Sequence, residues 1–325
     1  MPGQKRDKKS GRAKAGRPQT TSGEAPHAAH GAGPLLLTDR YLRGWPLPQP
    51  REGGDKEERG RVLVVGGSSE MPGACVLAAT AALRAGAGKL RIATTETIAP
   101  YVASAVPESR VFTLSETKSG AVSSGAAEKI AEEAEKVQAV VIGPGMIDSR
   151  AVSSLMVKLL PLIERPVVIL DAEALSCFAS APKFLDKLKC RTILTPHAEE
   201  MAGMTGESQE RIERQREETA RRAAEKFRAV VVLKGRETLI ASPGGDLYVN
   251  RAGNVGLATS GSGDVLSGIV TGLAARGSNP AQAAAWGVYL HARAGERLAE
   301  RMGRLGFLAR ELAAEIPSLM KELGE

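Results

Sequence analysis

The sequence predicts an α/β fold in which a mostly parallel sheet is covered by helices on both faces. Short apolar runs alternate with longer stretches of helical periodicity from about residue 34 to the end of the 325-residue chain. Such alternation is typical of a parallel sheet with helical connections. Glycine accounts for 36 residues and aromatic residues for only 3%. This composition favours a core of small aliphatic side chains with tight turns between strands and helices.

The strands are predicted where apolar, mostly β-branched residues run together and are followed by Gly, Pro or Asp. Because both faces of such runs are apolar, they indicate buried parallel strands. They cover residues 62–65, 90–93, 139–142, 167–170, 192–194 and 230–233. An antiparallel hairpin of residues 237–241 and 246–250 is expected around Pro243-Gly244-Gly245.

The helices are predicted between these strands and in the C-terminal part of the chain, where apolar residues recur with helical spacing. They cover residues 74–85, 126–137, 153–163, 210–228, 265–275, 281–301 and 308–323. No repeat of 20–50 residues is visible, which argues against a solenoid. We therefore expect one domain, residues 34–325.

A basic tail, residues 1–33, is expected before this domain. It contains seven Lys or Arg and two acidic residues, so it carries +5 of the net charge of +7. With almost no large apolar side chain, it is predicted to be disordered, and contact with anionic surfaces is the functional alternative. The nearly balanced charge of the domain argues against a nucleic-acid-binding function.

The cysteines and the distribution of apolar residues indicate the cellular compartment. Cys75, Cys177 and Cys190 are far apart and form no CxxC pair, which argues against a disulfide framework or a zinc site and favours a reducing cytoplasm. No run of 18 apolar residues is present, and the N-terminus lacks an apolar segment. Neither a membrane span nor a secretory signal is therefore expected.

The strongest functional signal is the loop of residues 259–263 (TSGSG), which precedes an apolar helix pattern that begins at Val265. Backbone N–H groups of Gly261, Ser262 and Gly263 at a helix start can bind an anion, and glycine allows a phosphate to approach closely. Asp264 follows in the first turn, where we expect the helix dipole to keep it ionised. The alternative is that Asp264 is an ordinary helix cap.

Four other segments are expected at the same edge of the sheet, because strand carboxyl ends and the loops after them share one edge. They are residues 66–74, 143–145, 195–197 and 234–235. Considered alone, each segment would be interpreted as an ordinary turn. His197 would be interpreted as a hydrogen-bonded structural histidine, and Lys234 as a solvated charge. Together they place a histidine, a strong cation and several Gly-rich loops at one rim.

Eight ordered motifs make the chain similar to the ADP-dependent NAD(P)H-hydrate dehydratase family of the ribokinase-like superfamily. They are residues 64–68 (VVGGS), 71–74 (MPGA), 85–88 (AGAG), 143–145 (GPG), 170–172 (LDA), 194–197 (LTPH), 233–235 (LKG) and 257–264 (LATSGSGD). The resemblance runs from about residue 34 to the C-terminus and includes residues 287–291 (GVYLH). It implies a three-layer ribokinase-like fold.

The resemblance also implies nicotinamide-cofactor repair. The S epimer of NAD(P)H hydrate would be dehydrated to NAD(P)H while ADP, the co-substrate, becomes AMP and phosphate. It further implies a requirement for Mg²⁺, without identifying metal ligands, and a cytoplasmic homo-oligomer such as a tetramer. Any epimerase would be a separate chain. ADP and ATP remain alternatives as the nucleotide.

Site residues follow from the same resemblance, position by position. The residues that match hydrate-binding positions are Ala74, Gly145, His197 and Asp264. The residues that match adenine-nucleotide-binding positions are Lys234, Gly235, Arg236, Glu237, Thr238 and Gly263. The chain departs from the family pattern at Glu173, Ala198, Glu199, Ser260 and Ser262. None of these departures removes a group with an assigned role, although Glu199 adds negative charge near the rim.

Asp264 is the predicted catalytic residue. It would orient the hydroxyl of the hydrate and accept its proton during attack on the β-phosphorus of ADP, while the loop amides stabilise the transferring phosphoryl group. Phosphate would then leave more readily than hydroxide. Two alternatives stay open: a ribokinase-like kinase of a small alcohol, such as a vitamin precursor or a sugar, and a non-catalytic nucleotide sensor.

Overall fold

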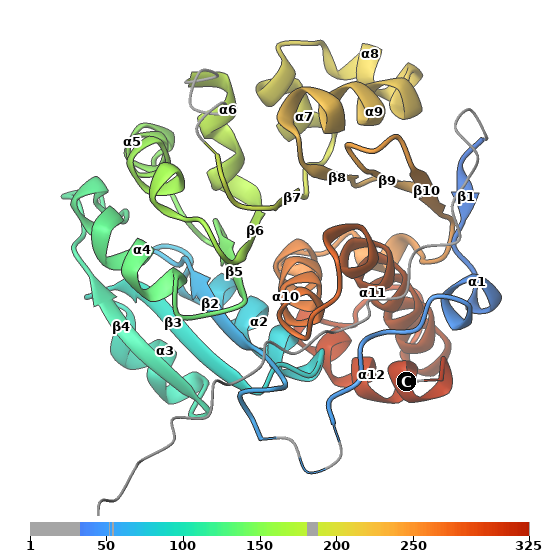
Figure 1. Ribbon diagram of the computed structural model, residues 1–325, viewed down its shortest axis with the longest axis horizontal. Coiled ribbons are helices and arrows are strands. Elements are labelled where there is room, and N and C mark those ends of the chain that lie inside the picture. The colour runs from blue at the N-terminus through green and yellow to red at the C-terminus, as the bar shows by residue number, and fades with distance from the viewer. Residues whose placement is uncertain (1–32, 52, 54, 181–187, 325) are drawn as a thin grey trace, which may run out of the picture.

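The computed structural model describes residues 33–51, 53, 55–180 and 188–324, and it shows one sheet with helices on both faces (Figure 1). Apart from Gly33, the predicted basic tail lies outside the described residues. Within them, ten strands form the sheet in the order β1-β10-β9-β8-β7-β6-β5-β2-β3-β4. Pairing is parallel except that β9 runs antiparallel to both β8 and β10. The predicted mostly parallel sheet is confirmed.

The six predicted parallel strands and the hairpin are present. The strands are β2 (Arg61–Val65), β3 (Lys89–Thr95), β5 (Ala139–Ile142), β6 (Val167–Leu170), β7 (Thr192–Leu194), β8 (Val230–Leu233), β9 (Thr238–Ala241) and β10 (Leu247–Asn250). Two further strands, β1 (Leu35–Leu36) and β4 (Ser109–Leu114), were not predicted. Both lie at the edges of the sheet. β4 is only half-buried, so it lacks the continuous apolar run by which the central strands were found.

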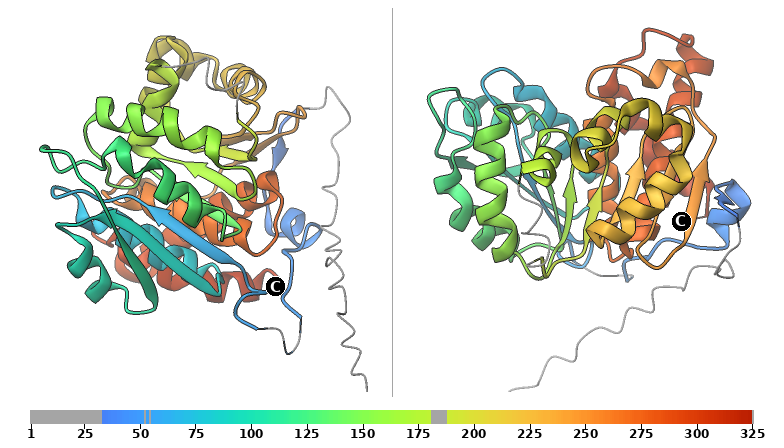
Figure 2. Two further views of the ribbon diagram at one scale, coloured as in Figure 1. Left: turned by 60° about the vertical axis from the view of Figure 1, so that its left-hand side comes forward. Right: turned by 90° about the horizontal axis from the view of Figure 1, so that it is seen from above.

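The helices form two layers, which Figure 2 shows on opposite faces of the sheet. One layer contains α1 (Asp39–Arg43), α2 (Pro72–Arg84), α3 (Ala99–Ala105), α10 (Ser262–Ala275), α11 (Pro280–Met302) and α12 (Ala309–Glu322). The other contains α4 (Ala127–Ala134), α5 (Ser149–Leu159), α6 (Cys177–Ser180), α7 (Ala198–Thr205), α8 (Gln209–Arg214) and α9 (Arg216–Phe227). The helix predicted over residues 210–228 is thus two helices. The chain breaks at Gln215, whose φ of −127° and ψ of 42° are not helical.

Each helical layer packs on the sheet through aliphatic side chains, as the composition predicts. One exception is an aromatic cluster at the β10 end. Trp45 stacks on Tyr248 with ring centroids 5.6 Å apart, and Trp286 Nε1 donates to the Trp45 carbonyl at 2.8 Å. The chain therefore joins the core well before its first long strand.

No helix among the described residues is both long enough and apolar enough to span a bilayer. The three cysteines are free thiols.

Candidate active site

The candidate site lies at the carboxyl edge of the parallel strands. Asp171 directly follows β6, Thr195 follows β7 and Lys234 follows β8. The N-terminus of α10 meets them there, since a Cβ atom built on Gly263 would lie 3.6 Å from Lys234 Nζ and 4.0 Å from Asp171 Oδ2. The predicted convergence of the strand-end loops and the Gly/Ser loop at one rim is therefore present.

The predicted anion loop is largely the first turn of α10. Gly261 is the N-cap with a φ of 86°, and the helix starts at Ser262, three residues earlier than the apolar pattern indicated. As a glycine, the cap residue has no side chain to bond the N–H groups of that turn, so these donors suit an anion. Ser262 is buried, and its Oγ lies 3.0 Å from Nε2 of His291 on α11.

Lys234 is part of a charged cluster rather than a solvated charge. Its Nζ lies 3.1 Å from Asp171 Oδ1 and 3.6 Å from Glu200 Oε2. Burial on its own would lower the pKa of Lys234, but the two carboxylates outweigh burial and raise that pKa. Asp171 is itself buried and accepts a 2.7 Å hydrogen bond from Thr195 Oγ1. Lys234 is therefore a fixed cation beside the first turn of α10.

Asp264 has an unusual electrostatic environment. Burial, followed by repulsion from Asp171, raises its pKa from 3.8 to about 7, although Lys234 opposes the shift. The expectation that the helix dipole keeps Asp264 fully ionised is therefore wrong. Desolvation of a carboxylate outweighs the favourable helix end here. A carboxyl group with a pKa near neutrality can take up and release a proton at physiological pH.

Ala74 and Gly145 are brought into contact by the loops after β2 and β5. Gly145 has a φ of 68°, and a Cβ atom at this position would lie 2.8 Å from the Ala74 Cβ and 2.5 Å from the Met71 carbonyl oxygen. Only glycine fits this conformation and this contact without strain. Two residues predicted to bind the hydrate thus form one small-residue surface at the start of α2.

His197 caps α7. Its Nδ1 accepts hydrogen bonds from the backbone N–H groups of Glu199 and Glu200 at 3.1 and 3.2 Å, and Glu200 accepts from the His197 N–H at 2.7 Å. The ring is 48% exposed, and its Nε2 lies 3.6 Å from Glu200 Oε1. The alternative of a hydrogen-bonded structural histidine is therefore observed, and substrate contact stays a prediction.

The predicted nucleotide-binding stretch 234–238 is the turn between β8 and β9. Lys234 points into the charged cluster, whereas Arg236 and Glu237 are exposed and Thr238 begins β9. Glu237 forms an ion pair with Arg251 at 3.0 Å. The stretch is therefore one continuous rim segment with a single inward cation.

Three residues of this cluster were not predicted as site residues: Asp171, Glu200 and His291. Asp171 follows a buried strand at the same edge as Lys234, so its position in the sequence was a usable signal. Glu200 reaches the site from the first turn of α7, and His291 reaches it because α11 packs on α10. Neither contact can be recognised from the neighbouring residues in the sequence.

Mg²⁺ is the metal that the resemblance implies. Among the described residues, no three His, Cys, Asp or Glu side chains gather as a metal cage, and Asp171 already bonds Lys234 and Thr195. Mg²⁺ commonly binds through substrate phosphates with one or two carboxylates and several waters. Within the described part of the chain, a bound phosphate would therefore have to supply part of the Mg²⁺ coordination.

The chain is similar to several known proteins. The family model described as NAD(P)H-hydrate dehydratase matches residues 62–318. An ADP-dependent (S)-NAD(P)H-hydrate dehydratase of Xanthomonas campestris is 45% identical over 289 residues, which cover 88% of this chain and 96% of that protein. A bifunctional NAD(P)H-hydrate repair enzyme of Moorella thermoacetica is 40% identical over 89% of this chain, but the match spans only 54% of that longer protein.

A solved structure is also similar. The ADP/ATP-dependent NAD(P)H-hydrate dehydratase of Bacillus subtilis, co-crystallised with ATP and Mg²⁺, superimposes with a TM-score of 0.75 at 32% identity. The superposition covers 89% of this chain and 98% of that one.

Proposed function

Because the chain belongs to the NAD(P)H-hydrate dehydratase family and has the three-layer ribokinase-like fold, we propose that it repairs hydrated nicotinamide cofactors. The substrate is the S epimer of NAD(P)H hydrate, and the products are NAD(P)H, AMP and phosphate when ADP is the co-substrate. The observation that carries the proposal is the position of Asp264, with a pKa raised to about 7, beside Lys234 in the first turn of α10.

In the first step, Asp264 removes the proton from the substrate hydroxyl while the oxygen attacks the β-phosphorus of ADP. The bond from that phosphorus to the oxygen shared with the α-phosphate breaks, and AMP leaves. N–H groups of the first turn of α10 and the Lys234 ammonium face the phosphoryl group as its charge redistributes. A base with a pKa near the working pH is suited to this proton transfer.

In the second step, the phosphate ester is eliminated. The lone pair on the ring nitrogen expels phosphate from the neighbouring carbon, and loss of a proton from the adjacent carbon restores the ring double bond. Ala74, Gly145 and His197 are proposed to hold the hydrate, because Ala74 and Gly145 form a surface without protruding side chains.

The adenine nucleotide is proposed to bind along residues 234–238 and Gly263, with Lys234 as the cation for its phosphates. Mg²⁺ would bind together with those phosphates, which is consistent with the absence of a protein-only cage among the described residues. Because a relative described as ADP/ATP-dependent was co-crystallised with ATP and Mg²⁺, either ADP or ATP is proposed as the nucleotide.

Three further properties are proposed. The free thiols of Cys75, Cys177 and Cys190 support a reducing, cytoplasmic location. An epimerase that supplies the S epimer is proposed as a partner activity, since a similar protein of Moorella thermoacetica is described as a bifunctional NAD(P)H-hydrate repair enzyme. Exposed Val255, Leu305 and Leu308 offer an apolar surface for a homo-oligomer, and light scattering would test a tetramer.

The test of function is a reaction with purified protein, chemically prepared NADH hydrate, Mg²⁺ and either ADP or ATP. Recovery of NADH absorbance together with equimolar AMP and phosphate from ADP is the expected result. A lasting phosphate ester without NADH would indicate a kinase, and nucleotide binding without phosphate release would indicate a sensor.

A further inference from the structure

We propose that Arg216, the first residue of α9, is a positioning residue that orders the nucleotide-binding turn between β8 and β9. The inference rests on the proposed function, because residues 234–238 are assigned to the nucleotide only there. Arg216 is outside that turn and outside every motif that carried the family resemblance.

The guanidinium of Arg216 binds three backbone carbonyls at the two ends of the turn. Its Nη2 lies 3.0 Å from the Leu233 and Lys234 oxygens and 3.2 Å from the Glu237 oxygen. Its Nη1 bonds both carboxylate oxygens of Glu213 at 3.1 Å. The side chain is only 17% exposed. Hydrogen bonds from a charged, planar donor are stronger and more directional than neutral ones.

These contacts set the direction of the peptide groups in the turn. In a planar trans peptide the C=O and the following N–H point in opposite directions. Because the Lys234 carbonyl faces Arg216, the Gly235 N–H faces away from Arg216. The Lys234 N–H donates to the Pro196 carbonyl at 2.8 Å. Arg216 thus fixes the Lys234 backbone, neutralises carbonyl dipoles that would repel phosphate, and leaves the Gly235 N–H on the opposite side as a donor.

The position of Gly235 gives independent support for a close contact between Arg216 and the turn. A Cβ atom at this position would lie 2.5 Å from Nη2 and 2.8 Å from Cζ of Arg216. The group that lies closest to the missing side chain of Gly235 is thus the Arg216 guanidinium. A side chain at position 235 would therefore have to displace the guanidinium from the turn.

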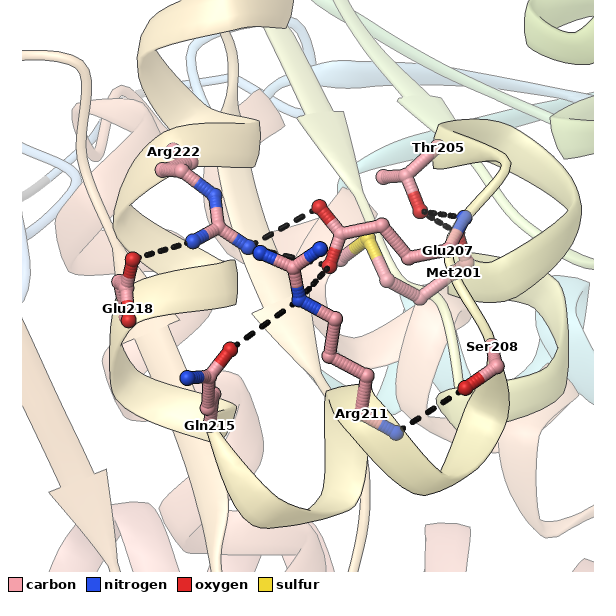
Figure 3. Close-up of polar contacts among 8 residues, drawn as sticks. All are labelled: Met201, Thr205, Glu207, Ser208, Arg211, Gln215, Glu218 and Arg222. Atoms are coloured by element: carbon pink, nitrogen blue, oxygen red, sulfur yellow. Dashed lines mark hydrogen bonds and ion pairs between the residues drawn. The ribbon is translucent and has the colours of Figure 1, made fainter.

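Figure 3 shows a second arginine of α9 that provides a matched control. Arg222 bonds both carboxylate oxygens of Glu207 at 2.9 and 3.0 Å and also pairs with Glu218. It braces α9 against the loop after α7 but has no contact with residues 234–238. Replacement of either arginine removes ion pairs from the same helix, while only Arg216 touches the turn.

The experiment compares Arg216→Gln, Arg216→Lys and Arg222→Gln in the full chain. ADP affinity is measured by calorimetry, and kcat, KM for ADP and melting temperature are measured alongside. We expect both Arg216 variants to raise Kd and KM for ADP by about tenfold or more, because lysine keeps the charge but lacks the planar fork. The KM for NADH hydrate should change less than twofold. Arg222→Gln should lower the melting temperature while ADP affinity stays within about twofold of wild type.

A double-variant cycle adds a readout that helix stability does not affect. Gly235→Ala should weaken ADP binding in the wild-type background, because the new methyl group displaces the guanidinium. In an Arg216→Ala background the same change should have little further effect.

Arg216 variants that bind ADP as wild type does would overturn the proposal. Equal loss of ADP binding in Arg222→Gln would do the same, because it would mean that α9 acts only through stability. Additive effects in the cycle would also overturn it, because they would mean that Arg216 and Gly235 act independently. Wild-type protein that fails to bind ADP would instead refute the proposed function.

Discussion

Replacement of Asp264 by Asn should abolish catalysis and stabilise the folded protein at the same time. Burial and the charge of Asp171 raise the pKa of Asp264 from 3.8 to about 7. The ionised carboxylate that the reaction needs is therefore unfavourable in the folded state. Asparagine has the same shape and no charge to desolvate, so it should remove both the base and the destabilisation.

The magnitude follows from the size of the shift. A gap of about 3 pKa units corresponds to an upper limit of about 4 kcal/mol, because each unit is worth about 1.4 kcal/mol. Between the two pKa values the folded protein keeps a proton that the unfolded chain has released. The stability contributed by this group is therefore lost as pH rises from about 4 to about 7. The excess stability of Asp264→Asn should be small at pH 4 and reach about 2–4 kcal/mol at pH 8.

Urea unfolding of both proteins at these two pH values measures the difference. Turnover should fall by about 10²–10⁴, and ADP binding should be retained or become tighter, since one negative charge beside the phosphates is removed. In the wild type, kcat should fall as pH drops below about 7. Asp246→Asn, in the β9–β10 turn at the opposite edge of the sheet, is the control and should change neither property. Turnover of Asp264→Asn within a few-fold of wild type, or no pH-dependent gain in stability, would refute the reasoning.

Four further outcomes are expected. Lys234→Ala should weaken ADP binding more than binding of the hydrate, and a full ADP-induced rise in melting temperature in this variant would contradict its assignment. Asp171→Asn removes a negative neighbour of Asp264, so the acidic limb of the pH–rate profile should move to lower pH; an unchanged limb would show that the two carboxyl groups are uncoupled. Trp45→Ala should destabilise the protein by about 3–5 kcal/mol in urea unfolding, because a buried, stacked ring is lost. Deletion of residues 1–33 should leave activity and melting temperature nearly unchanged, and a large loss of either would show that the tail packs or assembles the protein.

The central sheet could be predicted because most of its strands are buried on both faces and therefore largely apolar. β4 could not, since an edge strand that is only half-buried mixes polar and apolar residues. The break at Gln215 escaped prediction because residues 213–218 are all charged or polar. Such a run is equally compatible with the exposed side of one continuous helix, and it carries no information on the backbone angles of Gln215.

The features of the site were likewise only partly predictable from the sequence. Asp264 and Lys234 follow recognisable loop and strand signals, and the structure places both at one rim. The raised pKa of Asp264 could not be predicted, because it depends on how deeply the side chain is buried and on Asp171, which lies 93 positions earlier in the chain. Arg216 was likewise missed, because its partners are carbonyl groups, which every residue has.

The aromatic cluster at the β10 end has a consequence for how this protein folds during its synthesis. Trp45 and Trp286 are the only tryptophans, and they meet in one buried contact. β1 pairs with β10, and Leu35 lies opposite Tyr248. Residues 35–45 must therefore wait for more than 200 residues of translation before their partners exist. Contacts so distant in sequence form late. The intrinsic tryptophan fluorescence of this chain should consequently report the closing step of folding and remain silent during assembly of the central strands.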